Sequence, residues 1–518
     1  MKDFVKYFFF VIILFIFGCG NNGLLSPGTT GENLITEELV KHNIEFLASD
    51  SLKGRNTPSP ELDSAAAYIA GKFKAYGLQP IKGSYFQNVK LGYIKLGTDN
   101  RLIVKTNGDE IQYKIKTDFT PFEMTANKTA DAPIIFAGYG IDAPEYNYND
   151  YANIDVKGKI VFVLRHEPGE KDPESKFKGK NATKYSSVNE KVKIAIERGA
   201  AGVLVAQDPL NHIMLAPQGF PWPALSVFIP EDAIPLSILS GEEEKIPVVQ
   251  VGENIIKRLF GSVEKLKNIQ ADIDKRFKPN SFELPNTLVS LKTSTNISET
   301  DASNVVGFLE GSDPALKDEI IIIGAHYDHV GFNKTHQPGE DYIFNGADDN
   351  ASGTAAVMAV AAALGGSAPA PKRSVLFIAF CGEEKGLFGS LYYTRNPLFP
   401  KEKSIAMLNL DMIGRNNIDS LTIYGCGKNP KLLARVQLAN KNIGFNFNLQ
   451  NEIENGDSDH SSFQKIGIPS LCFHSGIHAD LHKVSDEASK INYNKVVKTA
   501  KLTFNAVELL ANDGTVFK

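Results

Sequence analysis

Cysteine is scarce in this sequence, with four residues in a chain of 518. One of them, Cys19, ends an N-terminal apolar segment. The other three, Cys381, Cys426 and Cys472, are an odd and widely spaced set, which excludes a disulfide framework and leaves one bridge at most. Buried cores or bound metal must therefore stabilise the fold.

The sequence also lacks clustered positive charge and several familiar catalytic signatures. The formal net charge is −5 and no block rich in lysine and arginine occurs, so we expect no nucleic-acid partner. Neither a Gly-x-Ser-x-Gly nucleophile elbow nor a Gly-Lys-Ser/Thr phosphate loop is present. The segment from His166 to Glu170 begins like a zincin helix motif, but it contains Pro168 and no second histidine.

The composition is that of an ordinary globular protein. Apolar residues make up 42% and charged residues 22% of the chain, so large buried cores are feasible. The length exceeds that of one ordinary domain, and we expect two or three.

The first residues indicate where the protein works. Lys2 and Lys6 precede an apolar run over residues 7–17, which is too short for a membrane-spanning helix of about 20 residues and predicts a signal peptide over residues 1–19. Ile16-Phe17-Gly18-Cys19 resembles a bacterial lipobox. The resemblance implies a lipid on Cys19 and membrane attachment in the bacterial cell envelope, facing the periplasm or the exterior. The alternative is an uncleaved anchor helix with an incidental cysteine.

Two further segments precede the middle of the chain. Residues 20–33 are rich in Asn, Gly, Ser, Pro and Thr, which predicts a flexible tether. Residues 34–129 are predicted to be the N-terminal part of the main domain. They contain two helical apolar stripes before residue 80, separated by a break at Asn56-Thr57-Pro58, and half-buried strands between 85 and 125.

The block over residues 130–270 differs from its surroundings. It contains an apolar run at Ile160–Leu164, a helical pattern at Val188–Arg198 and a second apolar run at Ala200–Val205, with little convergent acid–base chemistry. Its segments FAGYGI, NDYANIDVKGKIVFVL and AIERGAAGVLV resemble the protease-associated domain, a β-rich module inserted in several exopeptidases. The alternative is that the block is an ordinary part of one larger domain.

Residues 271–518 are predicted to be the C-terminal, catalytic part of the main domain. From about residue 285 onward strands and helices alternate, which predicts an α/β layer structure with a mostly parallel sheet. The predicted strands are Asn304–Leu309, Ile320–Gly324, Val375–Phe380, Ala406–Leu410, Leu421–Tyr424 and Pro469–Phe473. The predicted helices are Thr354–Leu364, Pro430–Asn440 and Asn492–Leu510. In such sheets ligands bind at the carboxyl ends of the strands.

Carboxylates and imidazoles follow these strands. They are His326, Asp328 and His329 after the second strand, Glu383 and Glu384 after the third, Asp411 after the fourth, and His474, His478 and His482 after the last. The segment GADDNASG, residues 346–353, stands just before a helix. We therefore expect these side chains to meet at one edge of the sheet.

Metal-dependent hydrolysis is the chemistry that uses such a set. Histidine and carboxylate ligands suit zinc, and two zinc ions need about five protein ligands with one carboxylate shared. Cobalt or manganese would fit the same residues. A separate carboxylate must take the proton of the attacking water and pass it to the leaving amine. The adjacent Glu383 and Glu384 meet both needs.

Five motifs carry a strong family resemblance: GAHYDHVG, NGADDNASG, CGEEKGLFGS, NLDMIG and HADLHKVSDE. Their order resembles that of the di-zinc aminopeptidase family, which includes glutamate carboxypeptidase-like members. The resemblance spans nearly all of the mature chain. It implies a three-layer α/β/α zinc-exopeptidase fold with a mixed, mostly parallel sheet and an inserted protease-associated domain. It also implies peptide substrates and two Zn²⁺ per chain.

The resemblance implies a role for each residue of the motifs. The implied metal ligands are His326 and Asp411 on the first zinc ion, Glu384 and His482 on the second, and Asp349 shared between them. Asp348 is the alternative for the shared carboxylate. Glu383 is the implied general base, and Asp328 is the implied carboxylate that orients the imidazole of His326.

Other polar residues near the motifs have less specific predictions. Family members often carry a tyrosine before the last histidine, where its hydroxyl helps to stabilise the oxyanion. Leu481 occupies that position here, and His460 is the candidate replacement. His329 is expected near the site without binding metal. His474 and His478 are expected to be solvated or supporting, with a ligand role as the alternative, and Cys381 is expected to be a packed small residue, with a zinc thiolate as the alternative.

The leading prediction is an aminopeptidase that hydrolyses N-terminal residues of peptides by a metal-bound hydroxide, with Glu383 as general base. A glutamate carboxypeptidase-like enzyme or a dipeptidase is the close alternative. It would need a basic residue for the substrate carboxylate, and Arg415 is the candidate. A glutaminyl cyclase, which works with one zinc ion, and a binding protein on an inactive peptidase fold are further alternatives. The complete ligand set disfavours both.

Overall fold

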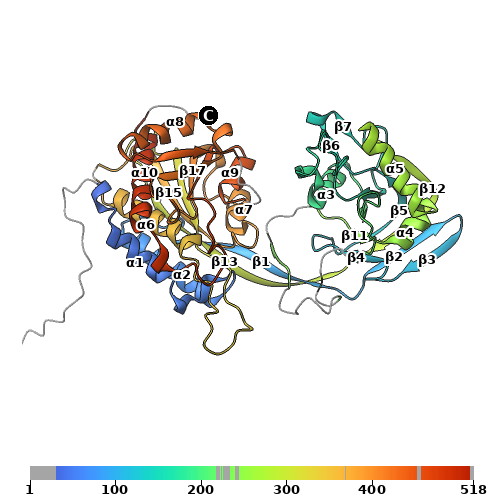
Figure 1. Ribbon diagram of the computed structural model, residues 1–518, viewed down its shortest axis with the longest axis horizontal. Helices are drawn as coiled ribbons and strands as arrows, with labels where there is room; N and C mark the ends of the chain where they lie inside the picture. Colours follow the sequence, from blue (N-terminus) through green and yellow to red (C-terminus); the bar gives the residue numbers. More distant parts are fainter. Residues whose placement is uncertain are drawn as a thin grey trace, which may run out of the picture.

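The computed structural model describes residues 31–513, apart from 218–221, 223–224, 226–233, 240–243, 368 and 452–456. The described chain forms two lobes joined by a pair of long strands (Figure 1). The predicted signal peptide, with Lys2, Lys6 and Cys19, and the predicted tether up to residue 30 lie outside the described residues. Within the described part, no helix combines the length and the apolar character that crossing a membrane requires.

Two helices open the first lobe, as the sequence predicted. Helix α1 (Glu37–Leu47) begins after Thr36, whose hydroxyl accepts the Leu39 N–H, and α2 (Pro60–Ala75) begins after Ser59, which caps it in the same way. Such caps satisfy amide groups that the first helical turn leaves without partners. The apolar stripes of both helices are buried in the core of this lobe.

A nine-stranded mixed sheet forms the centre of the first lobe, in the order β10-β1-β13-β15-β14-β16-β19-β17-β18. The strands are β1 (Phe86–Leu96), β10 (Leu236–Ile238), β13 (Thr295–Leu309), β14 (Ile320–His326), β15 (Ser374–Phe380), β16 (Ser404–Leu410), β17 (Ser420–Tyr424), β18 (Asn446–Leu449) and β19 (Ser470–His474). The central strands β15, β14, β16 and β19 are parallel, whereas β1, β10 and β13 pair antiparallel and β17 is antiparallel to β19. The predicted mixed sheet is confirmed, and its parallel strands lie at the centre of the sheet.

Helices cover both faces of this sheet. Against one face lie α1, α2, α6 (Gly353–Gly365), α8 (Pro430–Ala439) and α10 (Tyr493–Asn512); against the other lie α7 (Phe388–Arg395) and α9 (His460–Lys465). Successive side chains of β14 serve the two cores in turn, because neighbouring residues of a strand point to opposite faces. Ile321 and Ile323 join the first core, while Ile320 and Ile322 join the second. The predicted α/β/α layering is therefore confirmed.

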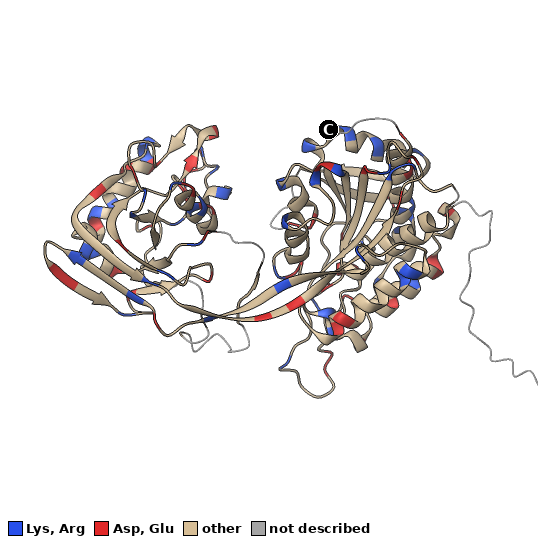
Figure 2. Cartoon of the chain, turned by 180° about the vertical axis from the view of Figure 1, so that it is seen from behind, with Lys and Arg blue, Asp and Glu red and all other residues tan. Residues whose placement is uncertain are grey.

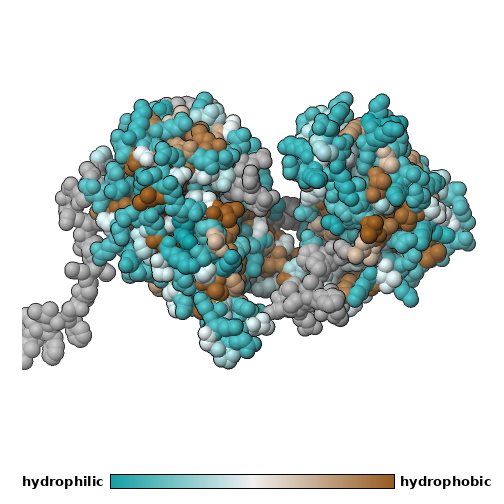
Figure 3. Space-filling view, in the orientation of Figure 1, coloured by the Kyte–Doolittle hydropathy of each residue, from teal (hydrophilic) through white to brown (hydrophobic). Residues whose placement is uncertain are grey.

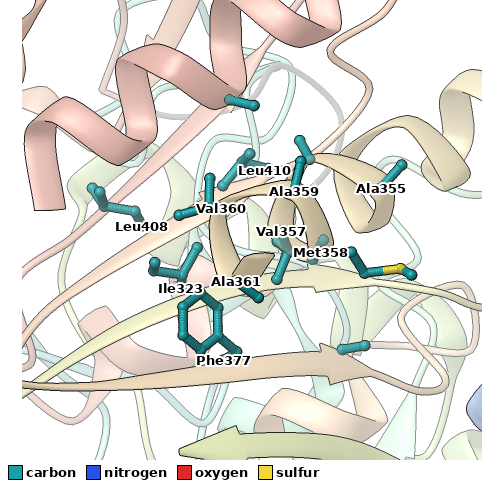
Figure 4. Close-up of a cluster of buried hydrophobic side chains, with 14 of the residues drawn as sticks. Ile323, Ala355, Val357, Met358, Ala359, Val360, Ala361, Phe377, Leu408 and Leu410 are labelled. Atoms are coloured by element: carbon teal, nitrogen blue, oxygen red, sulfur yellow. The ribbon is translucent and has the colours of Figure 1, made fainter. Parts of the chain in front are cut away.

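Helix α6 lies in the middle of the larger core. From Gly353 to Leu364 every residue is buried, as expected for a helix that is apolar on all sides. Figure 4 shows Val357 and Val360 of α6 near Ile323, Phe377 and Leu408 of the sheet. This packing fixes the helix that directly follows the GADDNASG segment.

Truncation of one of these contacts is expected to be costly. Leu408→Ala removes a fully buried side chain and should lower the free energy of unfolding by about 2–5 kcal/mol, because apolar burial is lost and a cavity remains. The matched control is Leu438→Ala on α8, where the side chain is 39% exposed and the expected change is within about 0.5 kcal/mol. Urea unfolding of both variants tests the difference, and equal losses would contradict this description of the core.

The second lobe is built on an eight-stranded sheet in the order β3-β2-β12-β5-β8-β9-β11-β4. Its strands are β2 (Arg101–Thr106), β3 (Asp109–Tyr113), β4 (Phe119–Pro121), β5 (Thr129–Phe136), β8 (Ile160–Leu164), β9 (Gly202–Ala206), β11 (Val248–Val251) and β12 (Phe282–Lys292). A small ladder pairs β6 (Asp142–Ala143) with β7 (Tyr148–Asn149). The helices are α3 (Val188–Glu197), α4 (Glu253–Phe260) and α5 (Val263–Arg276). The predicted strands at 160–164 and 200–205 and the helix at 188–198 are thus present.

The sheet of the second lobe extends beyond the block expected at residues 130–270. Strand β12 pairs with β2 from Lys292–Arg101 to Thr287–Thr106. The short β10, although it lies inside that block, pairs with β1 in the first sheet. Strands β1 and β13 form the long connecting ribbon of Figure 1, paired from Phe86–Val305 to Leu96–Thr295. The boundaries at 130 and 270 remain a prediction for the inserted unit.

The surface of the described part is mixed in charge. Figure 2 shows acidic and basic residues interspersed along the backbone of both lobes, and Figure 3 shows a mainly hydrophilic face with small apolar patches. In the interior, Cys381, Cys426 and Cys472 are buried and free. The single bridge that the sequence left open is therefore not formed among these three residues.

Candidate metal centre

Four neighbouring parallel strands deliver polar side chains to one edge of the first sheet. Strand β14 ends at His326, β15 is followed by Glu383 and Glu384, β16 by Asp411, and β19 by the loop that carries His482. The carboxyl ends of parallel strands lie at the same edge, and the hydrogen-bonded order β15-β14-β16-β19 makes these ends neighbours. The structure therefore brings together segments that are far apart in the sequence.

The segment Ala347–Ser352 adds Asp349 to this edge, just before α6. Gly346 has a φ of +59°, and a Cβ atom at this position would collide with the carbonyl oxygen of Asp349 and the ring of His329. Only glycine fits such a left-handed and crowded position without strain. The local sequence thus allows the chain to turn tightly over the end of β14.

A first group of side chains gathers around His326. Its Nε2 lies 3.3 Å from Oδ1 of Asp411 and 3.3 Å from Oδ1 of Asp349. Glu383 belongs to the same group, with ligand atoms of His326, Glu383 and Asp411 within 4.8 Å of one another. Asp411 is held by Ser458, whose hydroxyl donates to Oδ2 at 2.6 Å. Its Oδ1 is therefore the oxygen that faces His326.

A second group gathers around His482. Its Nε2 lies 3.1 Å from Oδ2 of Asp349 and 3.0 Å from Oε2 of Glu384. His329 completes this group, with Nδ1 at 2.8 Å from Oε1 of Glu384. Asp349 contacts both groups, because one of its oxygens faces His326 and the other faces His482. A carboxylate in this position has the geometry of a shared ligand.

The neighbouring Asp348 points elsewhere. Its Oδ1 accepts the Gly414 N–H at 2.6 Å, and its Oδ2 lies 3.2 Å from Nε2 of His478. Asp486 in turn accepts the N–H groups of Asp348 and Asp349. Asp348 therefore belongs to the supporting structure below the two groups, and Asp349 is the carboxylate between them.

Asp328 contacts the segment that carries the two glutamates. Its Oδ1 accepts the Glu383 N–H at 3.1 Å, and its Oδ2 accepts the Thr57 hydroxyl at 3.1 Å. The distance from Oδ1 to Nδ1 of His326 is longer, 3.7 Å. The predicted contact with His326 is present but loose, and the direct hydrogen bonds of Asp328 go to the Glu383 backbone and to Thr57.

Arg55 is a supporting residue that the sequence did not reveal. It is fully buried, and its guanidinium donates to the carbonyl groups of Leu47, Tyr327, Asn345 and Gly346. Burial lowers the pKa of Arg55 to about 10, so it remains charged at neutral pH. Arg55 therefore ties the N-terminal segment to the two loops that carry Asp328 and Asp349. Its long sequence separation from both loops hides this role.

The electrostatics of the two groups are those of a site short of positive charge. Burial and the nearby carboxylates of Asp411 and Asp459 raise the pKa of Glu383 well above its usual range. Hydrogen bonds to Asp349 and Glu384 raise the pKa of His482 to about 10. Both shifts favour the protonated forms of these two side chains when no other cation is present. Bound divalent ions would replace the protons and leave the carboxylates ionised.

The donor set fits divalent metal ions. The two groups contain four carboxylates, Asp349, Glu383, Glu384 and Asp411, together with three imidazoles. Ionised, these carboxylates carry four negative charges, which two divalent cations balance. Among the common divalent ions, zinc suits such a mixture of imidazole and carboxylate ligands.

The remaining histidines and the cysteine have other surroundings. His474 accepts the Gly476 N–H through Nδ1, and Cys381 packs in the core beside Asn304. His460 on α9 is buried, and burial lowers its pKa to about 4, so its imidazole is neutral at neutral pH. His329 lies near the two groups, as expected from its position three residues after His326, and contacts Glu384.

Comparisons with known proteins find similar sequences for both lobes. The model of peptidase family M28 matches residues 304–507, and the PA domain model matches residues 128–259. Aminopeptidase YwaD of Bacillus subtilis is 27% identical over 343 residues, which cover 64% of this chain and 58% of that protein. The probable lipoprotein aminopeptidase LpqL of Mycobacterium tuberculosis is 24% identical over 366 residues, 67% of this chain and 56% of that protein. The chain thus spans little more than half the length of these relatives.

Among solved structures, an aminopeptidase from Aneurinibacillus sp. strain AM-1 has the same fold. The TM-score is 0.50 at 21% identity, and the match covers 94% of this chain and 97% of that one. This likeness extends over both lobes, and the two family models fall on the two sheets. Residues 304–507 are therefore similar to peptidase family M28, and residues 128–259, between the first strands and the rest of the first lobe, are similar to the PA domain.

Proposed function

We propose that this protein is a metal-dependent exopeptidase that removes the N-terminal residue of peptides and uses two divalent ions. The observation that carries the proposal is the position of Asp349, whose two oxygens face His326 at 3.3 Å and His482 at 3.1 Å. A carboxylate shared by two histidine–carboxylate groups is the arrangement that a pair of ions requires. The relatives named aminopeptidases support the same reaction class.

Each ion has its own proposed ligands in addition to the shared Asp349. His326 and Asp411 would hold one ion, and His482 and Glu384 the other. Zinc is proposed because of the mixture of imidazole and carboxylate donors. When bound, the ions polarise the scissile carbonyl and lower the pKa of bound water to about 7. His329 contacts Glu384 at 2.8 Å, and we assign it the task of orienting that carboxylate.

Glu383 is the proposed general base. Its carboxylate lies beside His326 and Asp411 without the short carboxylate–imidazole contacts that Glu384 makes. In the first step it takes a proton from the attacking water, and in the second it gives that proton to the leaving amine. The Asp328 carboxylate fixes the Glu383 backbone through its N–H. His460, which is neutral at neutral pH, is the proposed donor to the oxyanion in the place of the tyrosine that Leu481 replaces.

Asp328→Asn tests the positioning of the base. The substitution exchanges a carboxylate, which accepts from the Glu383 N–H and the Thr57 hydroxyl, for an amide with one acceptor fewer. We expect kcat to fall by about 10–100-fold with KM nearly unchanged, as for other residues that support a metal centre. Steady-state kinetics measure this split. Thr57→Ser keeps the hydroxyl and is the control that should retain activity, and equal losses in both variants would argue against the role of Asp328.

The close alternative, cleavage from the carboxyl end, has less support. It requires a free cationic side chain near the metal ions, and Arg415 was its candidate. The guanidinium of Arg415 instead lies 2.6 Å from Asp480 and 3.8 Å from Asp486. Both acidic partners neutralise it, so we do not assign it to substrate binding. A glutaminyl cyclase, which works with one ion, would use only about half of these ligands, so the complete set disfavours it.

A peptide panel distinguishes these activities. Short peptides with free or acetylated N-termini are incubated with the purified protein, and released amino acids are identified by mass spectrometry. We expect release from the N-terminus of free peptides and none from acetylated peptides. Release of C-terminal residues from acetylated peptides would transfer the assignment to a carboxypeptidase. Cyclisation of N-terminal glutamine without hydrolysis would identify a glutaminyl cyclase.

We also propose that the protein is a lipoprotein of the bacterial cell envelope, anchored through Cys19. The support is the lipobox-like segment and the relative named a probable lipoprotein aminopeptidase. Cys19→Ala should move the protein from the membrane fraction to the soluble fraction and abolish incorporation of labelled palmitate, because the thiol is the attachment point. Cys426→Ala, which removes a buried free cysteine, is the control. Membrane attachment that persists without Cys19 would indicate an uncleaved anchor helix.

A further inference from the structure

A second cluster of histidines and carboxylates lies in the second lobe, which contains residues 128–259 that match the PA domain model and is called the PA lobe below, away from the peptidase groups. It consists of His166, Glu170, Asp208 and His212, with one ligand atom of each within 4.8 Å of all the others. The residues come from two loops that follow the neighbouring parallel strands β8 and β9. None of the four has a part in the proposed peptidase reaction.

The register of the sheet explains why the four side chains meet. Leu164 at the end of β8 is the partner of Ala206 at the end of β9. His166 and Asp208 each stand two residues beyond that pair, so they emerge side by side. Glu170 and His212 each follow four residues later. The two loops therefore present complementary patterns, His-x-x-x-Glu and Asp-x-x-x-His, at the carboxyl edge of the sheet.

The four side chains surround a common centre. Three of their distances are 3.0–3.8 Å, and the fourth, between His166 and Asp208, is the shorter distance of a direct hydrogen bond. Nδ1 of His166 lies 2.5 Å from Oδ1 of Asp208 and 3.8 Å from Oε2 of Glu170. Nε2 of His212 lies 3.0 Å from Oε2 of Glu170 and 3.6 Å from Oδ1 of Asp208. Tetrahedral zinc with bonds of about 2.0 Å separates its ligand atoms by about 3.3 Å. The contacts in the peptidase groups, 3.0–3.3 Å, lie in the same range.

The surroundings hold these side chains in place. Asp208 is fully buried, and its Oδ2 accepts from the side-chain amides of Gln270 at 3.2 Å and Asn211 at 3.3 Å. Its Oδ1 is thereby left to the histidines. His166 has a left-handed backbone with a φ of +58°, a conformation that costs free energy for a residue other than glycine. Its carbonyl accepts a hydrogen bond from buried Lys191.

The cluster is also accessible to a small ion. The side chains of His166, Glu170 and His212 are 23%, 26% and 31% exposed, while that of Asp208 is covered. The two imidazole rings stack at 4.4 Å between centroids, and protonation of both would place two like charges against each other. A divalent ion neutralises both carboxylates and leaves both imidazoles uncharged.

We propose that His166, Glu170, Asp208 and His212 bind one zinc ion in the PA lobe, separate from the peptidase ions. Two imidazole nitrogens and two carboxylate oxygens, all accepted zinc ligands, complete a four-coordinate site without a position for substrate, and four protein ligands are what a structural site has. The ion joins the loop after β8 to the loop after β9. It thereby fixes the segment that carries the exposed Ile213 and Met214.

The proposal is tested by the difference in metal content between the wild-type full chain and a variant that lacks two of the ligands. Wild type and His166→Ala/His212→Ala protein are equilibrated with Zn²⁺, separated from free metal and measured by inductively coupled plasma mass spectrometry. We expect the double variant to hold one ion per chain fewer than wild type. His42→Ala, which changes an exposed histidine of α1, should hold as many as wild type. Peptide hydrolysis by the same samples reports on the peptidase groups, so failure of either assignment is seen separately.

A second variant keeps the test decisive if the double variant does not fold. Glu170→Gln preserves the volume of the side chain but removes its charge, and it should weaken zinc binding at this site by about tenfold or more. Competition with a chromophoric zinc chelator measures that affinity. Equal metal content in a folded double variant, or an unchanged zinc titration in Glu170→Gln, would overturn the proposal. The cluster would then be a network of ion pairs.

Discussion

Replacing Glu383 by glutamine should lower kcat by about 10²–10⁴-fold, the usual contribution of a general base, while the metal content stays that of wild type. Glutamine has nearly the same shape as glutamate but cannot accept the proton of the attacking water. Burial raises the pKa of Glu383 because its charged form is desolvated, so the neutral amide should be tolerated without loss of stability. Steady-state kinetics and metal analysis on the same sample measure both quantities.

The adjacent Glu384→Gln is the matched control for this prediction. The Glu384 carboxylate contacts His482 at 3.0 Å and His329 at 2.8 Å, so its replacement should lower the metal content as well as the activity. The two glutamates thus differ in one measured property, retention of metal. Loss of metal in Glu383→Gln and full retention in Glu384→Gln would reverse the two roles.

Asp349→Asn should lower kcat/KM by about 10³-fold or more, because a metal ion supplies several kcal/mol of transition-state stabilisation and 1.36 kcal/mol corresponds to a factor of ten. The amide nitrogen that replaces one oxygen cannot serve as a ligand. The variant should therefore hold at least one ion fewer than wild type. Metal analysis and the hydrolysis of a free peptide test both parts.

The same substitution at the preceding residue is the control. Asp348 accepts the Gly414 N–H and faces His478, away from the two groups. Asp348→Asn should therefore retain the ions, and its main effect should be on the unfolding midpoint. If Asp348→Asn lost the metal while Asp349→Asn kept it, the shared carboxylate would have been assigned to the wrong residue.

Much of the fold was predictable where one physical signal dominated. The continuous apolar run at residues 160–164 predicted β8 within its observed bounds, because a strand buried on both faces has no polar positions. Strands β14, β15 and β16 were found for the same reason, and α6 was recognised from its alanine-rich apolar sequence. Convergence of His326, Glu384 and Asp411 followed from the rule that places ligands at strand ends.

Other features depend on contacts that the sequence does not display. Strand β18 consists of exposed or half-buried residues, so it has no apolar pattern. Strand β10 joins the first sheet from within the inserted block, which no local signal indicates. Arg55 acts through the carbonyls of residues about 270–290 positions away. Such pairing is decided by tertiary packing.

The sequence displayed only half of the cluster in the PA lobe, namely the segment that carries its first histidine and its glutamate. The segment from His166 to Glu170 did not fit a zincin motif, since that motif needs both histidines on one helix. Its partners Asp208 and His212 lie on another loop, and only the register of β8 against β9 brings them together. The spacing of four residues in both loops becomes meaningful once the strands are known to be neighbours.

Anomalous X-ray diffraction at the zinc absorption edge, on crystals of the wild-type protein grown without chelator, tests the central claim most directly. We predict two strong peaks beside Asp349, one near His326 and Asp411 and the other near His482 and Glu384, separated by about 3.5–4 Å as in other two-metal sites. A single peak beside Asp349, or two peaks there with Asp349 bound to only one of them, would contradict the two-ion mechanism and the assignment of Asp349 as the shared ligand.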